Sequence, residues 1–176
     1  TNTRPLSKFD KNQICTPCNY ISKEKLRDIK WTYREQQLKN IIKKLKEKTS
    51  SKYDCIIGVS GGKDSTRQAL FLKKFNINPL LVSCQYPPEQ QTDIGNHNLQ
   101  NLINLGFDTI TITPAPTTSK KLMLKCLKKY GNLFNASELA LYSSLPSLAI
   151  AYNISMIVLG ENPAMSWNNY AGKKVS

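Results

Sequence analysis

A short glycine-rich segment between an apolar run and a helical pattern constrains the fold of this chain more than any other feature. The segment is Ser60-Gly61-Gly62-Lys63-Asp64-Ser65, and it follows the strand-like run at residues 55–59. Glycines let backbone amides crowd around an anion, and the first amides of a helix have no internal partner. Because Lys63 adds a positive charge, the sequence predicts a phosphate site at the end of a strand.

Two commoner motifs overlap this segment, and neither is favoured. A Walker A loop needs glycine at position 57, which is isoleucine, and a hydroxyl side chain at position 64, which is aspartate. The pattern Gly58-Val59-Ser60-Gly61-Gly62 matches a nucleophile elbow, with Ser60 as the nucleophile. The chain's one histidine, His97, lies in a polar stretch close by, however, and little sheet precedes Ser60. We therefore do not favour a hydrolase.

Composition limits the choice of fold and partners. The 176 residues can bury one good core, and no apolar run is long enough to span a membrane. The net charge of +13 lies mostly in residues 1–52 and is mostly lysine, whereas arginine suits bidentate phosphate recognition. We therefore expect solvated helix faces and no specific nucleic-acid partner. Five cysteines are expected to be reduced thiols of a cytoplasmic protein.

The spacing of apolar residues predicts strands that alternate with helices. Strands are expected at residues 53–59, 79–84, 109–113 and 156–159, and helices at 31–48, 65–75, 94–105, 120–130 and 146–152. Gly106 and Gly131 act as helix stop signals, and Pro146 suits a first helical turn. The expected inward-facing side chains include Ile41, Leu70, Ile103, Leu127 and Tyr130. This order predicts an α/β fold with a parallel sheet and right-handed crossovers.

Polar or small residues follow three of the predicted strands. They are the segment Ser60–Ser65, then Ser83, and finally Gly160, Glu161 and Asn162. Ligands of parallel sheets lie at the carboxyl ends of the strands, so these residues are predicted to line one crevice. An ordinary loop residue is the slightly preferred interpretation of Ser83. A ligand-binding role is better supported for Glu161 and Asn162, because a carboxylate and an amide follow an apolar strand abruptly.

Cys15 and Cys18 form the second motif, a Cys-x-x-Cys pair in a polar N-terminal stretch. Redox, zinc and iron–sulfur sites all use this spacing. Nothing strand-like precedes Cys15, which favours a metal over redox chemistry. Tetrahedral zinc needs four ligands, so the other two would lie upstream of Thr1. Two unliganded thiols in a loop are the open alternative.

The segment at residues 60–65 resembles the PP-loop of the ATP pyrophosphatase superfamily, whose pattern is Ser-Gly-Gly-x-Asp-Ser. That resemblance implies a Rossmann-like, adenine nucleotide α-hydrolase-like domain that splits ATP into AMP and pyrophosphate. It also implies that Lys63 stabilises the departing pyrophosphate and that Asp64 helps to hold Mg²⁺. By spacing alone, a helix-capping role for Asp64 is an equal alternative.

Over nearly its full length the chain is similar to N-acetyl sugar amidotransferases, which form acetamidino groups on bacterial surface sugars of O-antigens and flagellin glycans. The matching segments are Thr3-Arg4-Pro5, Phe9-Asp10, Cys15-x-x-Cys18, Tyr53-Asp54-Cys55-Ile56, residues 60–65, residues 98–108 and Gly160-Glu161-Asn162-Pro163. The resemblance implies an N-acetylated sugar substrate and a separate glutaminase subunit that supplies ammonia. It also implies Zn²⁺, bound by Cys15, Cys18 and a second cysteine pair before Thr1.

Composition and apolar spacing divide the chain into three parts: a cysteine module at residues 1–30, a linking helix at 31–52 and the PP-loop domain at 53–176. Family members are longer at both ends, so the chain is expected to be a piece of a longer protein. Residues 164–170 match the family less well. A PP-loop enzyme that modifies tRNA by thiolation or lysidine formation is the alternative, and the basic N-terminal part favours it. A nucleotide-binding sensor without activity is also left open.

Overall fold

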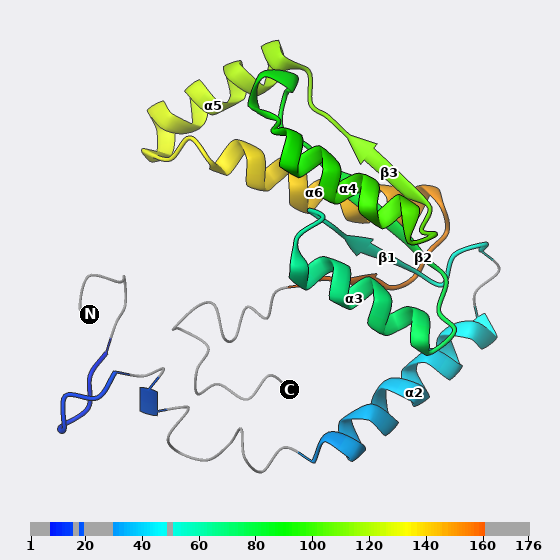
Figure 1. Ribbon diagram of the computed structural model, residues 1–176. Coiled ribbons are helices and arrows are strands. Elements are labelled where there is room, and N and C mark those ends of the chain that lie inside the picture. Colours follow the sequence, from blue (N-terminus) through cyan, green and yellow to red (C-terminus); the bar gives the residue numbers. More distant parts are fainter. Residues whose placement is uncertain (1–7, 16–17, 20–29, 49–50, 161–176) are drawn as a thin grey trace. The chain divides into compact units, whose positions relative to one another are not determined.

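The computed structural model describes residues 8–15, 18–19, 30–48 and 51–160 (Figure 1). Residues Lys39–Gly160 form one compact unit that contains the whole sheet. The elements are α2 (Trp31–Lys48), β1 (Cys55–Gly58), α3 (Lys63–Lys74), β2 (Pro79–Cys84), a 3-10 turn (Pro88–Gln90), α4 (Asp93–Asn104), β3 (Thr109–Ile112), α5 (Pro116–Tyr130), α6 (Asn135–Ala151) and β4 (Ile157–Val158). Among the described helices, none is both long and apolar enough to cross a membrane.

The four strands form one parallel sheet in the order β3-β2-β1-β4, which confirms the predicted α/β class. β1 lies inside the sheet, where Ile56 pairs with Leu80 of β2 on one side and with Ile157 of β4 on the other. The side chain of Ile56 is fully buried. Such continuous burial explains why β1 and β2 are apolar runs rather than alternating sequences.

Helices cover both faces of the sheet. The chain runs from β1 through β2 to β3 in one direction and then returns to β4 on the far side of β1. Right-handed crossovers therefore place α3 and α4 on one face and α6 on the other. On the α6 face, Ile56 and Val82 pack in a buried cluster with Leu145 and Ala149. Figure 1 shows α5 lying along α6, and the two helices are in contact.

The predicted start of one helix is wrong. Pro146 was expected in a first turn, but α6 begins at Asn135 and carries Pro146 in its interior. The ring removes one backbone donor. Nearby serines add hydrogen bonds to backbone carbonyls of the helix: Ser144 Oγ donates to Leu141 O at 2.8 Å, and Ser147 Oγ donates to Ser143 O at 2.8 Å. The apolar residues of α6 leave no single stripe that would have revealed its true start.

Several side chains that were expected to face inward are exposed instead. These are Ile41, Leu70, Ile103, Leu127 and Tyr130. On α5 the one buried position is Cys126, because this helix packs mainly against α6. The stop signals were read correctly, since Gly106 and Gly131 follow their helices with φ of 84° and 66°.

Candidate phosphate-binding site

The segment Ser60–Ser65 lies at the topological switch point of the sheet. It leaves the carboxyl end of β1, which has β2 on one side and β4 on the other. The backbone N–H of Val59 donates to Val82 O at 2.9 Å, so the segment begins level with the end of β2. Open parallel sheets bind their ligands in the crevice at such a point. The fold therefore places the glycine-rich segment where the sequence predicted a ligand.

The loop turns directly into α3 and leaves its first amides without partners inside the helix. Gly62 is the N-cap residue, with extended backbone angles and no side-chain cap. The first helical hydrogen bond runs from Thr66 N to Gly62 O at 3.1 Å. The amides of residues 63, 64 and 65 therefore have no acceptor in their own helix. Together with the positive end of the helix dipole they form an anion site.

Gly61 is the residue that shapes this turn. Its φ is +77°, and a Cβ atom placed there would lie 2.8 Å from the backbone carbonyl carbon of Asn98 on α4. Both the angle and the contact require glycine, because a non-glycine residue is strained at positive φ and no atom fits at that distance. The loop is thus packed against the backbone of α4. Sequence spacing did not predict this contact.

The two charged residues of the loop, Lys63 and Asp64, contact each other on its surface. Lys63 Nζ lies 3.0 Å from Asp64 Oδ1, and both side chains are more than three-quarters exposed. Asp64 is not the N-cap of α3, since Gly62 occupies that position and Asp64 is the second residue of the helix, with its carboxylate on the Lys63 ammonium. The capping alternative is therefore wrong. Both side chains remain open to a ligand at the loop.

The hydroxyl groups of the loop support its backbone. Ser65 Oγ donates to Gly62 O at 3.1 Å, and the Ser65 side chain is largely buried. The amide of Gly62 faces Ser60 Oγ at 3.4 Å. Thr66 Oγ1 makes a longer contact of 3.4 Å with Gly61 O. These contacts hold the turn in shape, while Ser60 itself is exposed at the rim.

The other predicted rim residues are placed unequally. Ser83 is buried at the carboxyl end of β2, opposite Thr111 of β3. Gly160 is exposed just after β4, and Gln68 of α3 reaches the same strand end by donating from Nε2 to Leu159 O at 2.9 Å. The end of β4 is therefore tied to the helix that carries the loop. Glu161 and Asn162 lie outside the described residues.

The cysteine pair lies in a separate turn. Asp10 Oδ1 accepts the amides of Asn12 and Ile14 at 2.9 and 3.0 Å, and residues Phe9 and Cys15 form an antiparallel bridge. The pKa of Cys15 is lowered because its sulfur accepts hydrogen bonds from the backbone and the thiol of Cys18. The pKa of Cys18 is raised because its thiol donates to Cys15. In the described ranges, no group of three or more metal-ligating side chains surrounds this pair.

The remaining cysteines behave as buried thiols. Burial raises the pKa of Cys55 to about 12 and also raises the pKa of Cys84. Cys126 is buried on α5. Thiolate chemistry is therefore disfavoured at Cys55 and Cys84, whose charged forms are penalised by the low-dielectric interior.

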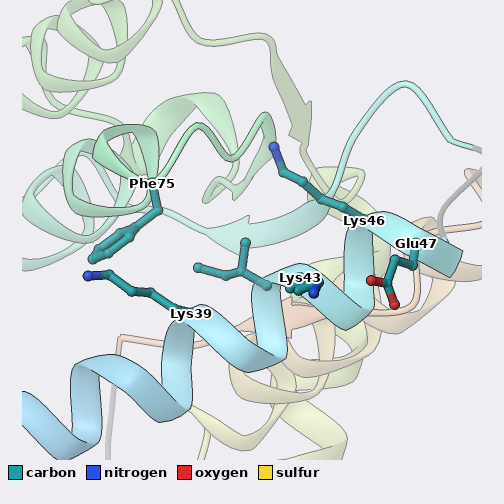
Figure 2. A pocket seen from close by; sticks show the side chains of 6 residues that line it. Lys39, Lys43, Lys46, Glu47 and Phe75 are labelled. Carbon is teal, nitrogen blue, oxygen red and sulfur yellow. The ribbon is translucent and has the colours of Figure 1, made fainter.

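Two hollows lie on α3, and they differ in their relation to the loop. The larger, of about 850 Å³, begins at Gly61 and Lys63 and runs between α3 and α4. The smaller, of about 460 Å³, lies between α2 and the end of α3. Figure 2 shows its lysines, with Lys39 beside Phe75. The Lys39 ammonium lies 6.0 Å from the centre of the Phe75 ring, and Lys46 Nζ donates to Asn76 O. None of the predicted site residues lines this smaller pocket.

Comparison with known proteins supports the fold assignment. No family model and no curated protein matches the chain. Among solved structures, it is similar to NMN synthetase from Francisella tularensis, with 18% identity and a TM-score of 0.57 over 81% of this chain and 59% of that one. It is also similar to the NH3-dependent NAD synthetase from Campylobacter jejuni, with 17% identity and a TM-score of 0.54 over 81% of this chain and 61% of that one.

These similarities are distant and concern the fold. They confirm the prediction of an adenine nucleotide α-hydrolase-like α/β domain with a four-stranded parallel sheet. The chain spans about three-fifths of the length of each of these two structures.

Proposed function

We propose that the protein is an ATP pyrophosphatase of the PP-loop type that activates its acceptor by adenylation. The observation that carries this proposal is the turn at residues 60–65, whose amides without a helical acceptor and Lys63 side chain gather at the switch point of a parallel sheet. Such a turn suits a chain of phosphates better than a single carboxylate, because it offers several donors in a row. The residue pattern of the loop further supports the PP-loop type.

The residues of the loop have distinct tasks in this proposal. The amides of residues 63–65 and the ammonium of Lys63 bind the β- and γ-phosphates and stabilise the negative charge that develops on pyrophosphate as it leaves. The exposed carboxylate of Asp64 fits a Mg²⁺ site, since Mg²⁺ is commonly held by one or two carboxylates together with substrate phosphates. That ion would neutralise phosphate charge. Gly61 holds the turn at the correct distance from α4.

We further propose that the acceptor is the N-acetyl amide of a bacterial sugar. The amide oxygen attacks the α-phosphorus of ATP, the bond to the bridging oxygen breaks, and pyrophosphate departs as the amide nitrogen loses its proton. Ammonia then adds to the activated carbon, and AMP leaves with the former amide oxygen. The product is an acetamidino sugar. The segments that resemble N-acetyl sugar amidotransferases, residues 98–108 among them, support this acceptor over tRNA.

Two further elements of the proposal lie beyond the loop. A glutaminase subunit would supply ammonia, because free ammonia is scarce near neutral pH. Zn²⁺ would be bound by Cys15 and Cys18 with two further ligands, and the lowered pKa of Cys15 suits a thiolate ligand. The zinc site would stabilise the N-terminal turn and take no part in the reaction.

Product analysis tests the adenylation step. Protein incubated with ATP, Mg²⁺, ammonium and an N-acetylated bacterial sugar should release AMP and pyrophosphate and yield a sugar product about one mass unit lighter. Lys63→Ala should lower turnover by roughly 100-fold or more, the scale for removing one preorganised charge-stabilising group. Lys120→Ala, which removes an exposed lysine of α5, is the matched control and should keep full activity.

Each half of the proposal can fail separately. Release of ADP and phosphate would contradict the PP-loop chemistry. Release of AMP with no turnover of any sugar, together with sub-micromolar binding of one tRNA at physiological salt, would retain the adenylation step and replace the sugar by RNA.

A further inference from the structure

The hollow between α3 and α4 is a groove that continues from the phosphate loop. It begins at Gly61 and Lys63 and ends at Lys74, the last residue of α3. Lys63, Arg67, Leu70 and Lys74 are spaced by four, three and four residues, so they lie along one face of the helix. At 1.5 Å per residue this stripe is about 16 Å long. The groove therefore starts at the loop and extends beyond it along α3, as a second surface beside the nucleotide site.

The charges in this groove are all of one sign. Among the described residues that line it, none carries a carboxylate. Lys73 is already engaged, since its ammonium donates to Leu105 O at 3.0 Å and lies over the ring of Phe107. Arg67 and Lys74, in contrast, are exposed and form no ion pair within the described part of the chain. Because Lys63 is assigned to the phosphate loop and Lys73 is engaged, Arg67 and Lys74 are the two cations that remain for an anion in the groove.

The rest of the lining is suited to a ligand that is more than a bare anion. Leu70 and Phe71 are 37% and 42% exposed and lie between the two cations along α3. Asn98 and Asn101, one turn apart on α4, add amide groups that can donate and accept hydrogen bonds. An aromatic ring can stack on a planar base, and the amides suit sugar hydroxyls. The volume of about 850 Å³ is within the usual range for sites of small ligands.

We infer that this groove binds the nucleoside diphosphate portion of a nucleotide-linked acceptor, with Arg67 and Lys74 on its phosphates. This inference rests on the proposed function, because it names the class of acceptor that is adenylated at the loop. Arginine suits the diphosphate because its guanidinium can donate two parallel hydrogen bonds to one phosphate. A small ligand is favoured over an RNA strand, since the available cations are two and cover one short stripe of a helix.

The test compares the double variant R67Q/K74Q with the wild-type chain. The probe is uridine diphosphate N-acetylglucosamine, titrated by calorimetry, with ATP and free N-acetylglucosamine titrated in parallel. We expect the double variant to bind the nucleotide sugar at least about tenfold more weakly, since hydrogen bonds to charged groups are among the stronger ones. ATP affinity should change less than twofold, and the free sugar should bind weakly to both proteins.

The control variant is K120Q/K121Q, which removes the same charge from exposed positions of α5. It should bind the nucleotide sugar as the wild type does, and thermal unfolding should confirm that both variants are folded. Equal affinity of R67Q/K74Q and wild type for the nucleotide sugar would overturn the inference. So would an equal loss of ATP affinity, an equal loss in K120Q/K121Q, or no measurable binding of the probe to the wild type.

Two further outcomes distinguish this inference from RNA binding in the groove and from the proposed function at the loop. Tighter binding of a 20-nucleotide single-stranded RNA than of the nucleotide sugar, lost in R67Q/K74Q, would reassign the groove to RNA. Binding of the nucleotide sugar that depends on Arg67 and Lys74, without any binding of ATP, would support the groove and refute the proposed function at the loop.

Discussion

Replacement of Gly61 by alanine tests whether the loop is held by its contact with α4. At φ of +77° an alanine costs about 1–2 kcal/mol relative to an unstrained residue. The new methyl group would also lie 2.8 Å from a backbone atom of Asn98, and overpacking of this kind costs about 1–3 kcal/mol. Alanine restricts the unfolded chain and offsets about 0.4–1 kcal/mol. We expect a net loss of about 2–4 kcal/mol in the free energy of unfolding.

Two other glycines provide matched controls for this substitution. Gly131 has a similar φ of +66°, but nothing lies within 4 Å of a Cβ placed there. Gly131→Ala should therefore show the backbone strain alone, about 1 kcal/mol after the offset from the unfolded state. Gly62 has a φ of −70° and its nearest neighbour is Ser60 Oγ at 3.4 Å. Gly62→Ala should cost about 1 kcal/mol or less, through the lost N-cap preference.

Urea denaturation monitored by circular dichroism gives the three free energies, and ATP titration reports on the loop. Gly61→Ala should be the most destabilised variant and should also bind ATP most weakly, because α4 and the loop can no longer approach each other. If Gly61→Ala is no less stable than Gly131→Ala, the contact with Asn98 carries no energy and the packing argument is refuted.

Two more predictions concern pKa shifts. At pH 7.5, iodoacetamide should modify Cys15 faster than Cys18 and should modify Cys55 most slowly. The reason is that a lowered pKa raises the thiolate fraction of a cysteine, whereas burial lowers that fraction. Mass spectrometry of peptides measures the order of modification. The pKa of Asp108 is lowered by a hydrogen bond from the Tyr53 hydroxyl and by Lys52. The Asp108 carboxylate therefore stabilises the fold above about pH 4, and this stabilisation is lost as the pH falls through the folded pKa. In the Asp108→Asn variant the melting temperature should therefore fall less steeply below about pH 4 than in the wild type. If the melting temperature depends on pH in the same way in both proteins, the Asp108 carboxylate is not the source of the acid sensitivity.

The strand pattern was predictable because burial on both faces leaves a clear signal. β2 has the predicted bounds, since the run Leu80-Leu81-Val82 is bordered by turn residues. The start of α6 was missed because the helix is apolar around much of its circumference and Pro146 resembled a first turn. The sequence does not show which of several similar apolar residues of a helix is covered by another element. Ile103 was therefore expected to face inward, but its side chain is about half exposed.

The site, too, has features that neighbouring residues predict and features that depend on contacts between distant segments. The loop residues were predictable, because strand, glycines and helix follow one another in the chain. The contact of Gly61 with Asn98 depends on how α4 packs and has no local signal. Arg67 was overlooked, although its spacing of four from Lys63 indicates the same helix face. The groove needs two helices that are separated by a strand, and only the fold brings them together.

Gly58 and Gly61 together restrict how the sequence of this domain can diverge. A Cβ on Gly58 would lie 3.0 Å from a methyl group of Leu145 on α6, so glycine here lets one helix settle on the sheet just before the loop. Gly61, inside the loop, meets the backbone of α4. A shorter side chain at position 145 could make room for alanine at 58. No side-chain change at position 98 could do the same for position 61, because the obstacle is main chain. Among sequences that keep this fold and loop, position 58 can therefore covary with position 145, while position 61 stays glycine.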